Sequence, residues 1–512
     1  MRFEYSNIKP IDSAIPASRQ KAKRHYGVHP YFTRRPPNVV RHYIQWYTRE
    51  GDRVLDPFGG SGVTAIEALL SNRIGIHKDI NPLGNFIARQ IADVSQPSAD
   101  HIRRAFSKLE ASCGDLIRDI YRISEGQVEY RLRQTKLPEN IQLPSNSDVP
   151  RFFDLFTRRQ LLALATLKNE IDDIHDKKAR AQLLLAWSAT LTKLNRTFLS
   201  AKGRLESRGG SSIFSIYRYK VAKAPVELDP WETFAERVSN VIKAKEEVLL
   251  EKRYLEEKGN WQGRFEVHAV DIGDLAEEIQ PVDYIFTDPP YGGHIAYLDL
   301  STLWNHWLGF EVSSELRKKE IIVGGELDIP EEKYVKRLGE SIGACFRLLK
   351  KDRWISIVFQ HWNTSYFEAI LEAAEEGGGS LRAAVTQVGD TIWSMHKKKN
   401  RERVLAGEMI LTFLKDEKLR RRKDPRHILE IEGLVDIVVP AVVSAKGELH
   451  SELLFNRLIT EAWQRNALHA LRIRREDFVD LLQRRGWHYN TQSHSWRRGQ
   501  SETAKQGALV FH

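Results

Sequence analysis

The residues with the clearest chemical potential are Asp288, Pro289, Pro290 and Tyr291, which follow an apolar segment at residues 282–286. Two successive prolines fix the backbone and remove two N–H donors, so the Asp288 carboxylate and nearby carbonyls offer only acceptors. An amino group carries two N–H donors, and such a cradle can take both. The Tyr291 ring offers a flat face for a planar base. The motif therefore predicts a site that grips the NH2 group of a base; the alternative is a proline-stiffened surface turn.

Amino nitrogens of adenine and cytosine are poor nucleophiles because their lone pair is delocalised into the ring. Acceptors that hold both hydrogens out of the ring plane would localise this lone pair toward an electrophile. The sulfonium of S-adenosylmethionine supplies such an electrophile, a methyl group, and alignment alone then suffices without a metal ion. These residues therefore suit methyl transfer to an amino nitrogen.

A second candidate site follows a short predicted strand, residues 53–55. It consists of Asp56, Pro57, Phe58, Gly59, Gly60, Ser61 and Gly62. Glycine lets the backbone turn sharply and approach a ligand closely, and the helix that follows presents free N–H groups. Asp79, after the next predicted strand, is placed to accept hydrogen bonds from ribose hydroxyls. The spacing fits neither GxGxxG nor a P-loop, which disfavours a nicotinamide cofactor and a phosphate cradle; a ligand-free turn is the alternative.

Together these motifs resemble those of the DNA amino-methyltransferases, the N6-adenine and N4-cytosine enzymes. Asp56–Gly62 is similar to their cofactor-binding DPFxGSG loop, and Asp79-Ile80-Asn81-Pro82 to their ribose-binding motif. Asp288–Tyr291 looks like their catalytic DPPY. The resemblance implies S-adenosylmethionine as the cofactor and duplex DNA as the substrate, with the target base flipped out of the helix.

The same resemblance implies further cofactor contacts. His29 and Tyr31 lie in a segment that looks like the one closing over the methionine end of the cofactor. Asp271, at the end of a predicted strand, would contact the adenine ring of the cofactor. The resemblance covers roughly residues 25–90 and 262–415, under half of the chain.

The apolar pattern predicts an α/β fold that positions both motifs. The expected architecture is a Rossmann-like S-adenosylmethionine-dependent methyltransferase sheet, divided between residues 1–98 and residues 261–415. Residues 99–260 show apolar residues mostly at steps of three and four, which predicts a large, mostly helical insert. Strands are expected at residues 53–55, 74–76, 265–270, 282–286, 354–359 and 409–414, and helices at 39–47, 63–70, 331–349 and 365–375.

After a basic linker, residues 430–512 predict a small C-terminal α+β module. Its predicted elements are two helices, at about 448–466 and 474–485, and an aromatic hairpin, an arrangement that is winged-helix-like. The short run Val438–Val443 contains Pro440 and is expected to be a buried strand or the start of a helix.

The chain has 512 residues and a formal net charge of +10, which favours a polyanionic partner. Candidate DNA contacts combine basic and aromatic residues in the insert with a later lysine run. They are Arg196, Lys202, Arg204, Arg208, Tyr217, Arg218, Tyr219, Lys220, Lys397, Lys398 and Lys399. After the DPPY motif, Tyr297, Trp304 and Trp307 recur at helical steps; we expect Tyr297 near the base pocket and the tryptophans in the core. The alternative for the insert is a solvated helical lid.

Two cysteines without metal-ligand spacing argue against disulfides and cysteine-based zinc sites, and we expect no metal. No signal pattern or membrane-length apolar run is present, which favours a cytoplasmic protein. Three alternatives to adenine-N6 methylation stay open: N4-cytosine methylation, guanine-N2 methylation of tRNA, and an inactive DNA-binding protein. A role in restriction-modification or phage defence would require a nuclease on a separate chain.

Overall fold

The computed structural model describes residues 4–18, 24–95, 98–199, 210–223, 226–270, 272–293, 295–387, 408–416, 430–446, 449–472, 475–490 and 495–498. The chain forms two compact units. The larger unit comprises residues 17–334 and 348–350, and the smaller unit comprises residues 1–16, 335–347 and 351–512.

A seven-stranded sheet with the order β5-β2-β1-β6-β7-β9-β8 forms the centre of the fold. Its bounds are β1 Arg53–Asp56, β2 Ile74–Lys78, β5 Arg264–His268, β6 Val282–Thr287, β7 Leu349–Phe359, β8 Gly379–Thr386 and β9 Met409–Lys415. Pairing is parallel between β5, β2, β1 and β6 and antiparallel between β7, β9 and β8. This mixed α/β architecture is the Rossmann-like fold that the sequence predicts.

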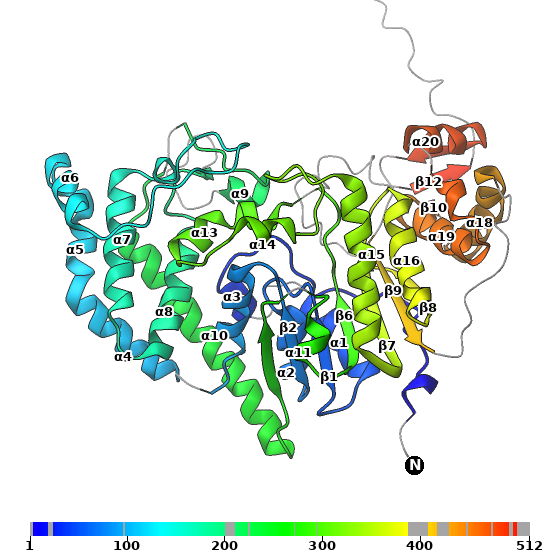
Figure 1. The fold of residues 1–512 in the computed structure, drawn as a ribbon, viewed down its shortest axis with the longest axis horizontal. Helices are drawn as coiled ribbons and strands as arrows, with labels where there is room; N and C mark the ends of the chain where they lie inside the picture. Colours follow the sequence, from blue (N-terminus) through cyan, green and yellow to red (C-terminus); the bar gives the residue numbers. More distant parts are fainter. Residues whose placement is uncertain are drawn as a thin grey trace, which may run out of the picture. The chain divides into compact units, whose positions relative to one another are not determined.

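The parallel strands of the larger unit carry the two motifs (Figure 1). All six residues of β6 are buried, as is typical of a parallel strand covered on both faces. Helices α1 (Pro37–Tyr47), α2 (Val63–Leu69) and α3 (Pro82–Ala92) pack around these strands. Proline opens both α1 and α3, where its missing N–H and fixed φ are tolerated. The carboxyl ends of β1, β2 and β6 therefore meet at one edge of the sheet.

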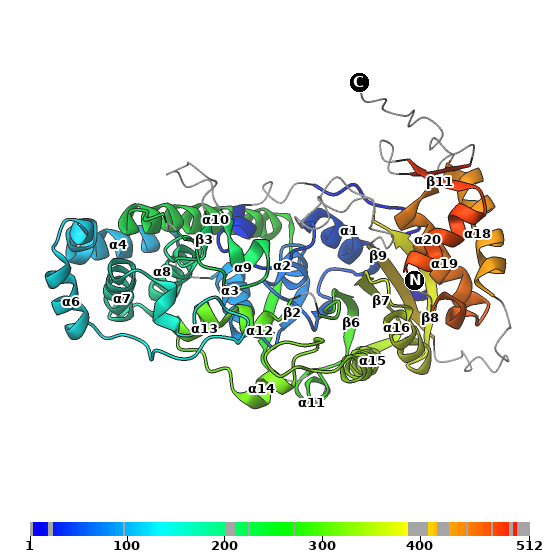
Figure 2. The same ribbon diagram turned by 90° about the horizontal axis from the view of Figure 1, so that it is seen from above.

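Residues 99–260 are mostly helical, as predicted (cyan to green in Figures 1 and 2). The helices α4, α7, α8 and α10 pack against one another around buried aromatic rings such as Trp187 and Trp231. The elements are α4 Ala99–Leu109, α5 Asp115–Arg118, α6 Glu125–Gln134, α7 Arg158–Asp172, α8 Lys177–Thr190, β3 Phe198–Leu199, β4 Gly210–Ser211, α9 Ser212–Ser215 and α10 Pro230–Lys258.

Short helices follow β5 and β6. They are α11 Leu275–Glu278, α12 Tyr297–Leu300, α13 Thr302–Trp307 and α14 Ser314–Lys318, and the longer helices α15 Glu331–Leu348 and α16 Thr364–Glu376 come next. The side chains of Trp304 and Trp307 are buried, as the sequence predicts.

In the smaller unit, the N-terminal segment contacts residues that come hundreds of positions later. The indole Nε1 of Trp354 donates a hydrogen bond to the carbonyl of Tyr5 at 2.7 Å. The Gln387 side chain accepts from the backbone N–H of Ile15 and donates to the Ile15 carbonyl. The first residues of the chain are thus tied to β7 and to the residue that follows β8.

The C-terminal part contains more structure than the sequence predicts. Its elements are α18 Ile431–Lys446, β10 Leu449–His450, α19 Ser451–Gln464, α20 Arg475–Arg484, β11 Trp487–Asn490 and β12 Ser495–Arg498, with strand order β10-β12-β11. The run from Val438 lies in the middle of α18, with Pro440 inside the helix, so the expectation of a strand or helix start is wrong. Buried Leu434, Val438 and Val442 recur at steps of four and explain the helix. The winged-helix-like assignment stays a prediction.

Among the described residues, no helix combines the length and the apolar character that crossing a membrane requires.

Candidate active site

The two motifs that the sequence singles out open onto one cavity in the larger unit, whose empty space is about 940 Å³ with the open solvent at its mouth included. Phe58–Ser61 line it from the glycine-rich loop, Asp79 from the end of β2, and Asp288 with Pro290 from the loop after β6. Tyr297 also lines it, as predicted. The glycine-rich loop and the DPPY motif therefore share a single site, which the transfer of a group between two bound molecules requires.

Asp56 joins the elements on either side of this cavity. Its Oδ1 accepts hydrogen bonds from the Thr287 hydroxyl at 2.8 Å and the Phe58 N–H at 3.1 Å. Its Oδ2 accepts from the Thr64 hydroxyl of α2 at 2.7 Å. One buried carboxyl thus fixes the glycine-rich loop relative to the residue that precedes Asp288.

Burial raises the pKa of Asp56 from 3.8 to about 7, although three hydrogen bonds to the carboxylate oppose the effect. The folded protein therefore binds this proton more tightly than the unfolded chain between about pH 4 and pH 7. The free energy of unfolding should fall as the pH rises through this window, by about 4 kcal/mol at most. Asp56→Asn should flatten this part of the profile. Urea unfolding at a series of pH values measures the effect, and an unchanged slope in the variant would contradict it.

The shape of the glycine-rich loop depends on the absence of side chains. A Cβ atom at Gly59 would lie 2.2 Å from Nδ1 of His77, whose buried ring stacks on Phe265. Gly62 has a φ of +91°, which only glycine adopts readily, and a Cβ there would lie 2.6 Å from Cβ of Ala88. The ring of His77, in β2, therefore lies directly against the backbone of the loop at Gly59.

Asp79 shapes the same loop from the end of β2. Its Oδ2 accepts from the Gly60 N–H, and its Oδ1 accepts from the Asn81 N–H, both at 2.7 Å. Burial raises its pKa. Since it also lines the cavity, the predicted contact with ribose hydroxyls stays a prediction compatible with its position.

The Asp288 carboxylate contacts an arginine that sequence reasoning missed. Arg35 donates from Nε to Oδ2 of Asp288 and from Nη2 to the Tyr291 hydroxyl, both at 2.5 Å. The Tyr291 hydroxyl in turn donates to Oδ1 of Asp288. The Arg35 guanidinium therefore donates to the Asp288 carboxylate, which the sequence predicts to be an acceptor for the amino group of a base. The Pro290 carbonyl accepts from the Tyr334 hydroxyl at 2.6 Å. The pair Arg34-Arg35 before two prolines is the only signal in the sequence for this contact.

The predicted upstream segment has one side chain at the cavity and one away from it. The ring of Tyr31 lies against Gly60 and lines the cavity. His29 is fully buried, with Nδ1 2.7 Å from the Pro30 carbonyl, and it is not among the lining residues; burial lowers its pKa to about 3. Arg34 also lines the cavity and donates to the Ser61 hydroxyl at 2.9 Å. Burial lowers its pKa to about 10, so it stays charged at neutral pH.

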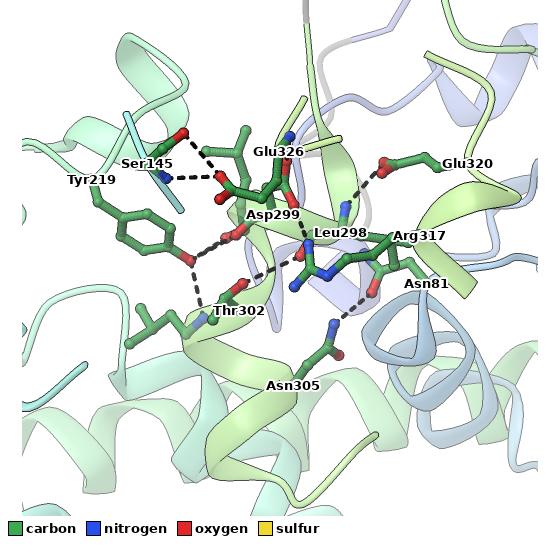
Figure 3. A network of polar contacts seen from close by, with 12 residues as sticks. Asn81, Ser145, Tyr219, Leu298, Asp299, Thr302, Asn305, Arg317, Glu320 and Glu326 are labelled. Carbon is green, nitrogen blue, oxygen red and sulfur yellow. Dashed lines mark hydrogen bonds and ion pairs between the residues drawn. The ribbon is translucent and has the colours of Figure 1, made fainter. Parts of the chain in front are cut away.

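The candidate DNA contacts in the insert differ in their surroundings. Tyr219 is fully buried, and its hydroxyl donates to the Leu300 carbonyl and accepts from the Leu303 N–H, so the prediction of a DNA contact fails for this ring (Figure 3). Arg196 donates to the Asp154 carbonyl and Arg218 forms an ion pair with Asp148.

The remaining residues predicted to contact DNA or the cofactor are half-buried, exposed or outside the described residues. Tyr217 is half-buried with a φ of +52°, and Lys220 is exposed. Lys202, Arg204, Arg208, Asp271, Lys397, Lys398 and Lys399 lie outside the described residues. Ile272, next to Asp271, lines the cavity.

Comparison with known proteins points to one family. A family profile described as DNA methylase matches residues 8–83. The chain is 24% identical over 308 residues to the type II methyltransferase M.MvaI of Kocuria varians, an alignment that covers 57% of this chain and 60% of that protein. It is 23% identical over 414 residues to the type II methyltransferase M.MjaII of Methanocaldococcus jannaschii, covering 69% of this chain and 75% of that protein. The chain is thus similar to DNA methyltransferases in sequence, and its DPPY and glycine-rich motifs lie on one cavity, as the resemblance to the DNA amino-methyltransferases implies.

Proposed function

We propose that this protein transfers a methyl group from S-adenosylmethionine to an exocyclic amino nitrogen of a base in DNA. The observation that carries the proposal is the single cavity lined by both the glycine-rich loop and Asp288. Methyl transfer needs donor and acceptor held in one site at reacting distance, and positioning can supply a large part of the rate enhancement.

The residues around the loop fit the cofactor. Gly59 and Gly60 line the cavity, and Asp79 offers a carboxylate at the end of the next strand. The buried Arg34 guanidinium beside Ser61 would hold the carboxylate of the methionine part. When bound, S-adenosylmethionine supplies an electrophilic methyl group on a sulfonium leaving group.

The DPPY residues act on the amino group. Asp288 accepts one N–H, and the Pro290 carbonyl has a second lone pair for the other beside its bond from Tyr334. Both interactions orient the nitrogen lone pair toward the methyl group. The Tyr291 ring stacks on the flipped base. Arg35 and the Tyr291 hydroxyl already donate to the Asp288 carboxylate, so the amino group has to compete with them for this acceptor.

Removing the Arg35 guanidinium should therefore ease entry of the base. Because a hydrogen bond to a charged group contributes roughly 1.5–3 kcal/mol, Arg35→Met should tighten binding of a flipped base about tenfold. The measurement is 2-aminopurine fluorescence at the target position as protein is titrated. Arg347→Met, at an exposed position of α15, is the control and should not change the curve. Weaker binding by Arg35→Met would show that Arg35 assists the base instead of competing with it.

Adenine N6 is the first target to test, because the resemblance of the motif, with Asp rather than Ser at position 288, tilts modestly toward adenine. Cytosine N4 presents the same amino geometry and is the second candidate. Nucleoside analysis of duplex DNA after incubation with the protein and the cofactor distinguishes N6-methyladenine from N4-methylcytosine. Methylation of tRNA and none of duplex DNA would contradict the proposal and favour the guanine-N2 alternative.

We further propose that residues 99–260 form the target-recognition region and that the net charge of +10 supports binding to duplex DNA. The relatives' designation as type II methyltransferases supports a role in restriction-modification, with the cognate nuclease on a separate chain. Sequencing of modified bases in DNA from cells that express the gene gives the recognition sequence.

A further inference from the structure

The cavity holds a buried carboxyl group that the transfer chemistry described above does not use. Glu320 lies just after α14, is 4% exposed and lines the same cavity as Asp288 and Tyr297. Its neighbours in sequence, Lys319 and Ile321, line the cavity as well. A carboxyl group is costly to bury unless it is hydrogen-bonded or serves a ligand.

Glu320 is held in place by a rigid set of polar contacts (Figure 3). Its Oε1 accepts a hydrogen bond from the Leu298 N–H of α12 at 3.0 Å. The next residue of α12, Asp299, accepts from the Glu326 N–H at 2.9 Å and pairs with Arg317 of α14. The ion pair therefore fixes α12, whose Leu298 N–H binds Glu320, to α14, which precedes Glu320. This keeps the carboxyl group at the cavity wall.

Burial is the main reason why the neutral form of the Glu320 carboxyl group is favoured. It raises the pKa to about 8; the Asp299 carboxylate acts in the same direction, while the Leu298 and Tyr297 N–H groups and the Arg317 guanidinium oppose the shift. The Tyr31 hydroxyl also interacts electrostatically with Glu320. At neutral pH the group therefore carries an O–H donor as well as an acceptor oxygen.

A neutral carboxyl group in the same cavity as Asp288 matches a particular base edge. In adenine and cytosine, the ring nitrogen beside the amino group, N1 or N3, is an acceptor. On the Watson–Crick edge of guanine, the N1 beside the amino group carries a hydrogen and is a donor. An acceptor for the amino group combined with a donor for the ring nitrogen therefore fits the Watson–Crick edge of adenine and cytosine but not that of guanine.

We infer that Glu320 is a specificity-determining residue that donates a hydrogen bond to the ring nitrogen beside the target amino group. This inference rests on the proposed function, which it deepens by defining the base edge that the cavity accepts.

The test uses duplexes that carry the recognition sequence, with adenine or 1-deazaadenine at the target position, or with cytosine or 3-deazacytosine if the product is N4-methylcytosine. The deaza bases lack the ring acceptor and keep the amino group. The wild-type protein should prefer the natural base by about ten- to a hundredfold in kcat/KM. Glu320→Gln, which still donates through its amide, should keep this preference, and Glu320→Ala should reduce the ratio to about one.

The pH dependence gives a second readout that does not need the alanine variant. The wild-type preference should decline as the pH rises through about 8, because the carboxylate cannot donate, while Glu320→Gln should keep its preference. Glu315→Gln, an exposed carboxylate on α14, is the matched control and should behave like the wild type.

Two results would overturn the inference. One is an equal rate on the natural and deaza bases by the wild-type protein. The other is a loss of S-adenosylmethionine affinity of tenfold or more in Glu320→Gln by calorimetry, which would place the carboxyl group at the cofactor. Absence of transfer to any DNA by the wild-type protein would instead contradict the proposed function, and this inference with it.

Discussion

Replacing Asp288 with alanine is expected to lower kcat for methyl transfer to DNA by about a hundred- to a thousandfold. The variant loses the acceptor that orients the amino group, and the loss of one preorganised hydrogen-bonding group in an active site has an effect of this size. Affinity for S-adenosylmethionine should stay within about twofold, because hydrogen bonds to Asp56 and Asp79 hold the glycine-rich loop in place without Asp288. Single-turnover transfer of a labelled methyl group, with calorimetry of cofactor binding, measures both quantities.

The control for this experiment is Glu340→Ala, which changes a carboxylate at the surface of α15 with 62% side-chain exposure. Its kcat should equal that of the wild type. Asp288→Ala also frees Arg35 and Tyr291, so thermal unfolding should accompany the assay. Full activity in a folded Asp288→Ala protein would exclude the mechanism proposed for the DPPY residues.

Replacing Gly59 with alanine is expected to abolish cofactor binding, with at least a hundredfold loss of affinity for S-adenosylmethionine. The added Cβ would lie 2.2 Å from Nδ1 of His77, whose ring is fully buried and stacks on Phe265. The loop must therefore shift and lose its shape. Calorimetric titration of the variant with the cofactor measures the loss, and circular dichroism reports whether the fold is kept.

Two companion variants separate this local effect from general damage. Gly27→Ala adds the same methyl group where nothing lies within 4 Å and should bind the cofactor as the wild type does. Gly59→Ala combined with His77→Ala removes the clash and should restore a large part of the affinity. The prediction fails if the double variant binds no better than Gly59→Ala.

The sequence predicts the sheet and the shared cavity because each motif comes at the end of an apolar segment that is recognisable as a strand. Asp56 and Asp288 each follow an apolar strand, and strands of a parallel sheet present their carboxyl ends at one edge. By contrast, the sequence analysis does not predict β8: the strand begins at the last of the glycines at 377–379, and most of its residues are only partly buried, which leaves no clear alternation. Likewise, Pro440 disguised the helical period of α18.

Contacts between distant residues could not be predicted in this way. Arg35 and Asp288 are separated by 253 positions, and nothing near either residue encodes their hydrogen bond. Glu320 is one of several charged residues in its segment, and only the fold buries it. Tyr219 shows the opposite error: its basic and aromatic neighbours suggested a nucleic-acid contact, but its ring fills the interior. The residue types in a segment do not determine which of its side chains face solvent, because this depends on how the segment packs in the folded protein.

The bond between Trp354 and Tyr5 has a consequence for how the chain folds as it is made. The two residues are 349 positions apart, and Ile15 and Gln387 are 372 apart. Since chains emerge from the ribosome N-terminus first, residues 4–16 wait for partners that are translated long after residues 17–334 have appeared. By then all residues of the larger unit except 348–350 have been made. The larger unit can therefore fold first, while residues 4–16 still lack the later residues to which they bind.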